Sequence, residues 1–318
     1  MQNLITVNVD TQLITAEQKS LLALAVGRIL DTTAANTAKK YIPNFKAFIA
    51  FCIENGFEFL PASPDTIEIY QKHLAEICRY SPATIQQHLA AIATFHSSVD
   101  LTNPVTKRVQ KKVTKLKREQ PQHQAKPALS STLYDAIDKI DTSSNKGKRD
   151  KALLLIGVIG CFRRSELAGI KIENCTFSPK GLQVTIFGSK TDKGGDGVIK
   201  AIEPNNVNRK YCPVKAVQEW LLVAQPDTYL FTTVTKYDTI QTNKPLDGQA
   251  VNRIVKSHLG DDFSGHSLRV GFAVQAYENG ASGLQIQKQG AWKSDAMVKR
   301  YTEASDIWAN NASSFFYR

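Results

Sequence analysis

A polar stretch without hydrophobic periodicity divides the chain into two parts with different patterns. Residues 118–128, REQPQHQAKPA, contain two prolines and show neither helical nor strand spacing. No segment before this stretch alternates like a β-strand, whereas later segments do. We therefore expect a helical N-terminal domain over residues 1–119, a linker over 120–128, and a second domain with helices and a small β-sheet over 129–318.

Helix signals follow one another through the first part. Ser81 and Pro82 are typical of a helix start, because serine caps the first amides and proline suits the first helical position. Gly56 follows an apolar segment and is typical of a helix end. After a loose arm of residues 1–14, the predicted helices cover residues 15–30, 33–55, 64–78 and 81–96.

The last segment before the linker is strongly basic and carries no acidic residue between positions 107 and 118. Like charges four residues apart destabilise a helix, and a polyanion lying along this face would offset that cost. The net charge of +11 and the pI near 9.3 also favour a polyanionic partner. The alternative is a solvated lysine-rich face. The basic residues are Lys107, Arg108, Lys111, Lys112, Lys115, Lys117 and Arg118, beside an apolar stripe of Val105, Val109, Val113 and Leu116.

Composition excludes several classes of protein. The sequence has no apolar run near 20 residues and no signal-peptide pattern, so we expect a soluble protein of the cytoplasm. The cysteines form no CxxC pair and no cluster with histidine, so we expect reduced thiols, no disulfide and no zinc site. We expect no cofactor. The cysteines are Cys52, Cys78, Cys161, Cys175 and Cys212.

The second part begins with helices and continues with a hairpin. Helical patterns cover residues 129–140 and 149–162, and the second is nearly all apolar and therefore expected to be buried. Residues 182–188 and 198–204 alternate like strands and flank a glycine-rich turn that contains Lys190. This lysine is either an ordinary solvated turn residue or a group that the hairpin carries into a site. Helices at 208–224 and 249–260 and a short strand at 229–231 are also expected.

Charged side chains follow directly after the buried helix. Arg163 and Arg164 open the sequence RRSEL, in which Glu166 stands three residues after the first arginine. The two arginines are either surface charges or an anion clamp that the core holds rigidly. The sequence alone leaves both interpretations open.

A segment near the C-terminus carries the densest set of chemically active side chains. His266 and Arg269 are three residues apart, so on a helix both face one target. Guanidinium matches phosphate oxygens, and imidazole moves a proton near neutral pH. Trp292 and Tyr301 are nine residues apart, on opposite sides of a straight helix, so we expect a break at Ser294, a typical N-cap. For each residue by itself, a helical core with charged edges is the alternative.

Together these side chains suit phosphoryl transfer on a nucleic-acid backbone. Two guanidinium groups, a lysine and an imidazole would surround the phosphate, and Tyr301 would be the nucleophile. No carboxylate cluster in the sequence resembles a metal site. Positive side chains would therefore neutralise the charge that develops in the transition state.

The motifs resemble those of tyrosine recombinases of the phage integrase family, over nearly the whole chain from about residue 33. The sequence GHSLRVG, with the following GAW and RY, is similar to the C-terminal motif of that family, with Trp292 where many members have histidine. RRSEL is similar to the arginine box, SKT to the lysine position, and TIQQHLAAIATFH to a helix that enters the major groove. Arg164 stands where many relatives have an aliphatic residue, so a shift of one residue would make it the ligand; the spacing to Glu166 favours Arg163.

The resemblance implies a mainly α fold with a small β-sheet. In it, a helical core-binding domain and an α+β catalytic domain form a C-shaped clamp on DNA. It also implies a site-specific recombinase that needs neither metal nor ATP and exchanges strands through a Holliday junction between two sites. In this role Tyr301 would attack the scissile phosphate and form a 3′-phosphotyrosine link. Arg163 and Arg269 would hold the non-bridging oxygens of the phosphate, and Lys190 would protonate the leaving 5′-oxygen. His266 would assist deprotonation of the tyrosine or stabilise the transition state. Trp292 would donate its indole N–H to the phosphate site, and Glu166 would orient the site.

The partners implied are double-stranded DNA with an inverted-repeat target and a homotetramer on two sites, in which the tail after Tyr301 docks into a neighbouring copy. Prokaryotic, phage or plasmid genes encode such proteins. Two alternatives remain: an inactive DNA-binding accessory protein and a type IB-like topoisomerase. The expected DNA contacts are Lys39, Lys40, Gln86 and Gln87 in the groove and Lys107, Arg108, Lys111, Lys112 and Lys115 on phosphates.

Overall fold

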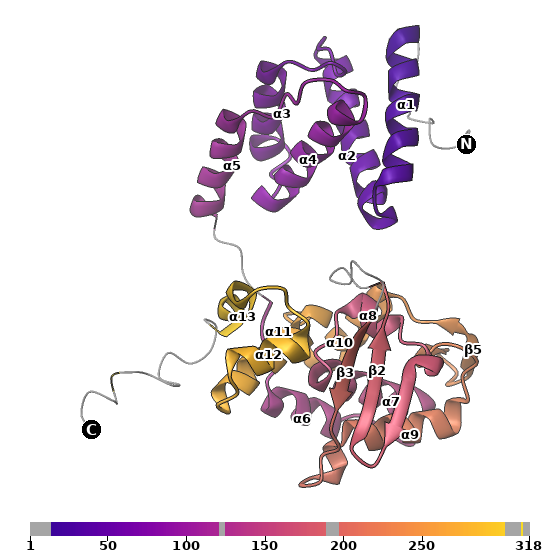
Figure 1. Cartoon of the computed structure of the whole chain (residues 1–318). Coiled ribbons are helices and arrows are strands. Elements are labelled where there is room, and N and C mark those ends of the chain that lie inside the picture. The colour runs from indigo at the N-terminus through magenta and orange to yellow at the C-terminus, as the bar shows by residue number, and fades with distance from the viewer. Residues whose placement is uncertain (1–13, 121–124, 189–196, 303–312, 314–318) are drawn as a thin grey trace. The chain divides into compact units, whose positions relative to one another are not determined.

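The computed structural model describes residues 14–120, 125–188, 197–302 and 313. It is mainly helical with small antiparallel sheets, as predicted (Figure 1). The chain forms two compact units, which divide between His123 and Gln124, inside the stretch predicted as a linker. Residues 1–13 of the predicted N-terminal arm, the lysine Lys190 and nearly all of the tail after Tyr301 lie outside the described residues.

Local sequence sets the helix starts of the first unit. Ser63 and Ser81 each accept a hydrogen bond from the backbone amide three residues further on, and each precedes a proline at the first helical position. The predicted start at Ser81 is therefore confirmed. The helices are α1 (Ala16–Thr32), α2 (Ala35–Glu54), α3 (Pro64–Glu76), α4 (Pro82–Ser98) and α5 (Lys107–Glu119).

Aromatic side chains fill the core of the first unit. Phe45 of α2 stacks on Phe95 of α4 with ring centres 4.0 Å apart, and Phe48 contacts Tyr70 of α3 at 5.0 Å. Val109 of α5 is fully buried in the same core. The apolar stripe predicted for the basic segment thus attaches α5 to the unit and leaves the basic side chains outside.

The second unit combines helices with two antiparallel sheets, ordered β1-β2-β3 and β4-β5. Its elements are α6 (Ser130–Asp138), α7 (Asn145–Ile159), α8 (Arg164–Ala168), β1 (Cys175–Ser178), β2 (Gly181–Ile186), β3 (Val198–Ile202), α9 (Pro213–Ala224), β4 (Thr232–Val234), β5 (Ile240–Pro245), α10 (Gly248–Leu259), α11 (Gly265–Glu278), α12 (Gly283–Gly290) and α13 (Asp295–Thr302). None of the helices in the described parts of the chain is long and apolar enough to cross a membrane.

The predicted hairpin is present, but other strands differ from the prediction. β2 and β3 pair as expected, and β1, which was not predicted, adds a third strand beside β2. Of the strand expected at residues 229–231, the structure has only an isolated antiparallel bridge between Tyr229 and Lys171, and β4 begins at Thr232. Leu230 and Phe231 are fully buried and bond to separate segments, so this part of the chain crosses the core before it joins a sheet.

The buried helix α7 lies at the centre of the second unit, as its apolar sequence predicts, and it packs against α9 and α11 (Figure 1). The helical structure is interrupted between α12 and α13, and α13 begins at Asp295, directly after the predicted break at Ser294. An earlier break, which was not predicted, separates α11 from α12 at residues 279–282 and includes Gly280 at φ 88°. Two turns therefore fold the last three helices back on one another.

Candidate active site

Arg163 lies at the start of α8 and is held by a buried carboxylate. Its backbone amide donates to Glu166 Oε2 at 2.9 Å, and its guanidinium pairs with Glu166 Oε1. The Glu166 side chain is 6% exposed and that of Arg163 is 24% exposed, so the carboxylate anchors a guanidinium that still reaches the surface. The neighbouring Arg164 is exposed and lies against Gly248 and Gly265. The two arginines therefore have different surroundings.

Arg269 of α11 is a buried guanidinium that joins two helix ends. It is 2% exposed and donates from Nη1 to the Cys161 carbonyl and from Nη2 to the Gly290 carbonyl. Its Cζ atom lies 4.2 Å from the centre of the Trp292 ring. A guanidinium has five N–H donors, so these two bonds leave donors for a further acceptor.

Tyr301 of α13 lies beside two of the predicted site residues in the same chain. Its ring centre is 5.6 Å from that of His266 and 5.3 Å from that of Trp292. Arg269 contacts the same indole, so Tyr301 and this guanidinium are both neighbours of Trp292. The helix break at Ser294 thus brings Tyr301 back to the start of α11, as the sequence predicted.

Trp292 has a buried donor without an acceptor. The residue is 4% exposed, and its indole Nε1 has no hydrogen-bond partner among the described residues. A buried N–H without a partner is destabilising by about 1–3 kcal/mol. Such a donor beside the Arg269 guanidinium indicates that an acceptor with negative charge completes the site.

The imidazole of His266 is surrounded by positive charge. Partial burial of the ring, followed by the positive charges of arginines 269, 300, 163 and 164, lowers the pKa of His266 below its ordinary value. The residue keeps an exposed edge. At pH 7 His266 is therefore neutral, and its free nitrogen is able to accept a proton.

One buried lysine of the second unit was missed by the sequence analysis. Lys200 of β3 is 1% exposed, and its ammonium donates to the carbonyls of Cys161 and Gln289, two residues before Arg163 and three before Trp292 in the chain. The sequence contained a signal for its burial, because Lys200 lies on the same inward face of β3 as Val198 and Ile202. The predicted Lys190 belongs to the part of the hairpin outside the described residues.

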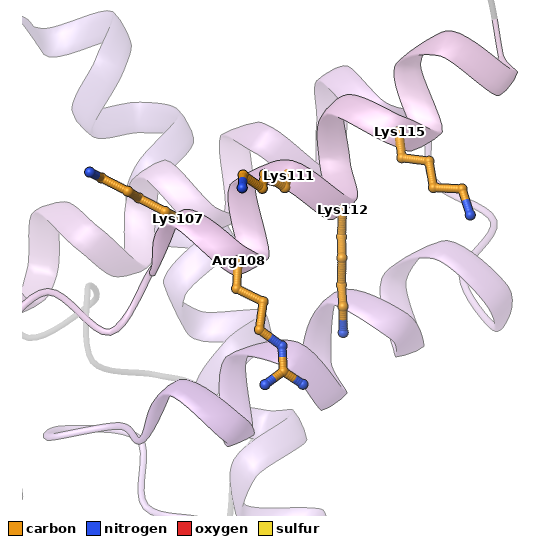
Figure 2. Close-up of a pocket in the computed structure, with 5 residues that line it drawn as sticks. All are labelled: Lys107, Arg108, Lys111, Lys112 and Lys115. Atoms are coloured by element: carbon orange, nitrogen blue, oxygen red, sulfur yellow. The ribbon is translucent and has the colours of Figure 1, made fainter.

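A second candidate site is the basic face of α5. Its side chains line a hollow of about 400 Å³. Figure 2 shows Arg108 and Lys112 extending to the same side of the helix. The lining residues are Lys107, Arg108, Lys111, Lys112 and Lys115. The predicted cluster of positive charge is thus gathered on one surface.

An acidic residue of α3 corrects one part of the sequence argument. Glu68 pairs with Arg108 at 2.8 Å and with Lys112 at 2.6 Å. Its hydrogen bond with Lys112, followed by the positive charges, lowers the pKa of this carboxyl. The repulsion along α5 is therefore partly offset within the protein by Glu68, whereas the sequence analysis had named a polyanion as the group that would offset it.

The other predicted DNA contacts lie on the surface of the first unit. Lys39 and Lys40 of α2 and Gln86 and Gln87 of α4 are all exposed. Lys117 of α5 donates to Gln86 Oε1. One of the two glutamines is therefore already bonded in the protein, and it would have to exchange this partner for a base edge.

Comparisons with known proteins agree on one family. The sequence profile of the Phage integrase family matches residues 127–307. The chain is 35% identical to the "Integrase/recombinase xerD homolog" of Selenomonas ruminantium, over 95% of this chain and 91% of that protein. It is 24% identical to "Recombinase cre" of Escherichia phage P1, over 96% of both chains.

A solved structure shows the same fold. The crystal structure of a lambda integrase dimer bound to a COC′ core site superposes with a TM-score of 0.61 at 15% identity. The match covers 92% of this chain and 96% of that chain. Both units of the chain are thus included in the likeness.

Proposed function

Since the chain belongs to the phage integrase family of tyrosine recombinases, we propose that it cuts and rejoins DNA at specific sites through a 3′-phosphotyrosine intermediate. One observation carries this proposal. Tyr301, His266 and Trp292 lie together in the second unit, and Arg269 lies against the same indole. A phenol oxygen, a neutral imidazole and guanidinium donors are the parts that this reaction needs.

In the proposed first step the Tyr301 hydroxyl attacks the scissile phosphorus. The new O–P bond forms as the bond to the 5′-oxygen breaks, and the phenol proton passes to neutral His266. Lys190 supplies the proton that the leaving 5′-oxygen takes up. The phosphodiester energy stays in the phosphotyrosine link, so the reverse attack by a 5′-hydroxyl of a second DNA joins the strands without ATP.

The electrostatic role belongs to the guanidinium groups. Arg163 and Arg269 bind the non-bridging oxygens and neutralise the charge of the transition state, as a metal ion does in other phosphoryl transfers. Glu166 keeps Arg163 in place through its two contacts. Arg164 is exposed to solvent, which supports the assignment of this role to Arg163.

The assembly that we propose is a homotetramer on two inverted-repeat sites. Both units of each chain would contact one half-site, and the exchange would pass through a Holliday junction. The basic face of α5 contacts phosphates, while Lys39, Lys40, Gln86 and Gln87 face the groove. The tail after Tyr301 docks into a neighbouring copy.

The proposal is tested with DNA selected by the chain itself. Bound DNA is recovered from a random library and inspected for an inverted repeat around a spacer. A duplex of that sequence with a nick near the cleavage point then traps the covalent complex, which a denaturing gel detects. We expect an adduct and, with two intact sites, recombinant product. Binding without an adduct would favour an inactive accessory protein, and relaxation of supercoiled DNA without a defined site would favour a topoisomerase.

Trp292→Phe is expected to slow cleavage about tenfold or more, because a hydrogen bond to a charged acceptor contributes about 1.5–3 kcal/mol. The substitution keeps an aromatic ring beside Arg269 and removes the buried donor that has no partner among the described residues. Removal of the unpaired donor and loss of buried ring volume act in opposite directions, so thermal stability should change little. Single-turnover cleavage and a melting curve test this; cleavage at the wild-type rate would remove the indole N–H from the mechanism.

Two substitutions on the basic face should change DNA affinity in opposite directions. Lys111→Ala removes a phosphate contact, so affinity falls for all sequences and the salt slope decreases by about 0.9. Glu68→Gln removes the anion that holds Arg108 and Lys112, so affinity rises. Binding titrations at several salt concentrations measure both effects.

The matched control for Glu68→Gln is Glu76→Gln. Glu76 lies on the same helix, α3, and forms an exposed ion pair with Lys72 at 3.8 Å. This variant removes the same charge without freeing Arg108 or Lys112. Equal effects of the two glutamate variants would show that only net charge matters, and no effect of Lys111→Ala would contradict the phosphate contact.

A further inference from the structure

Lys200 is a buried cation whose ammonium group is fully used. Its Nζ atom donates to the Gly160 carbonyl at 2.9 Å, to the Cys161 carbonyl at 3.0 Å and to the Gln289 carbonyl at 2.9 Å. An ammonium group has three donors, so each has one acceptor. The Phe162 ring lies 5.1 Å from the same nitrogen. A buried lysine is rare unless its charge has partners, and here those partners are backbone carbonyls.

The bonded carbonyls belong to two helix ends that face each other. Gly160 directly follows α7, and Gln289 lies in the last turn of α12. Arg269 shares the Cys161 carbonyl with Lys200 and also bonds the carbonyl of Gly290, the residue after Gln289. Lys200 and Arg269 thus form a pair of cations that holds consecutive peptide units of both helices.

The Gln289 side chain adds neutral bonds to the same junction. Its amide nitrogen donates to the Ile159 carbonyl at the end of α7 and to the Ala201 carbonyl of β3, each at 2.9 Å. The ends of α7 and α12 are therefore tied to β3 as well as to each other. A shift of β3 would move both helix ends.

Each of these helix ends leads directly into a site residue. Arg163 follows Cys161 by two residues, and Trp292 follows Gly290 by two residues. The C-terminal end of a helix carries a partial negative charge of about half an elementary charge, which would repel a phosphate. The cations at the two ends offset this charge next to the place where a phosphate would bind.

We propose that Lys200 is a positioning residue for the proposed cleavage reaction: its ammonium fixes the peptide units that place Arg163 and Trp292, and it offsets the negative helix ends beside the scissile phosphate. This inference rests on the proposed function. Lys200 does not touch the substrate, because its donors are bound to carbonyls. It acts through the residues that do.

The charge state of Lys200 supplies a distinctive signature. Burial lowers its pKa to about 8, an effect that Arg269 and Arg163 increase and that Cys161 and Glu166 reduce. A neutral amine has two N–H donors and cannot serve three carbonyls. The cleavage rate should therefore fall as the pH rises through about 8.

Stability should change in the opposite direction. An unfolded lysine titrates near about 10.4, so between about pH 8 and that value the unfolded state binds more protons than the folded state. The contribution of Lys200 to the free energy of unfolding therefore rises with pH over this window. A loss of cleavage that merely reflected unfolding would instead accompany falling stability.

The experiment compares Lys200→Met, Lys200→Arg and the control Lys180→Met, which removes an exposed lysine from the turn between β1 and β2. Single-turnover cleavage of the nicked duplex is measured from about pH 7 to about pH 9.5. We expect Lys200→Met to cleave about tenfold or more slowly than the control at about pH 7, with DNA affinity within about twofold. Lys200→Arg should lose the decline near pH 8, relative to its own rate at pH 7, because guanidinium stays charged.

Several outcomes would overturn the inference. One is cleavage by Lys200→Met at the rate of Lys180→Met. Another is an identical pH profile of the relative cleavage rate for the wild type and Lys200→Arg. This outcome remains decisive if Lys200→Met does not fold. Failure of the proposed function is distinguishable, because then the wild-type chain itself forms no adduct, and the inference falls with it.

Discussion

Tyr301→Phe is expected to bind the target DNA with unchanged affinity and to form no covalent adduct. The hydroxyl is the atom that attacks phosphorus, and its removal leaves no nucleophile for the first step. The ring contacts with His266 at 5.6 Å and Trp292 at 5.3 Å are available to phenylalanine, so the site should keep its shape. Trapping on the nicked duplex measures the adduct, and a gel shift measures affinity.

The control for this variant is Tyr237→Phe. Tyr237 is 78% exposed and lies between β4 and β5, so the same loss of a hydroxyl should leave the adduct unchanged. Covalent trapping of the Tyr301→Phe chain would show that another side chain is the nucleophile. Loss of DNA binding together with the adduct would show instead that α13 supports the DNA-bound form.

Arg163→Ala is expected to lower the cleavage rate by about 10² or more, by analogy with the loss of an oxyanion donor, which costs about 2.7 kcal/mol or more. The Glu166 carboxylate would also lose its buried partner. Arg163→Lys keeps a charge near Glu166 and removes the planar fork, so it should fold and still cleave more slowly than the wild type. Single-turnover rates and melting curves separate the loss of a phosphate contact from a loss of stability.

Arg164→Ala is the matched control, since it removes the same group from the adjacent, exposed position. We expect it to cleave within about threefold of the wild type, because water screens an exposed charge and its contribution is small. A loss of cleavage rate below threefold in Arg163→Ala would refute the role of Arg163 as a phosphate clamp. A large loss in Arg164→Ala instead would move the role to the second arginine.

Many local features were predictable because they depend on residues that are neighbours in the chain. Ser81 caps α4, Val109 faces the core and α13 begins after Ser294, as the sequence indicated. Capping, helical spacing and charge clusters are short-range properties. The choice of Arg163, His266, Arg269, Trp292 and Tyr301 came from their chemistry and their motifs.

Features that depend on distant pairing were missed. The strand β1 has no alternation strong enough to predict, and it exists because β2 offers an edge. The compensation of Arg108 and Lys112 by Glu68 joins α3 to α5. These contacts depend on how helices and strands pack, which sequence spacing does not specify.

The sequence by itself determined which side chains are available: a basic helix, two adjacent arginines, an imidazole three residues from a third arginine, and a tyrosine after a helix break. Only the tertiary structure decided their relations. It separates Arg163 from Arg164, and it places Tyr301 beside His266. It also gives Lys200 acceptors 40 and 89 residues away in the chain. Hydrogen bonds of that range depend on how distant elements pack against one another, whereas helix periodicity needs only a few neighbouring residues.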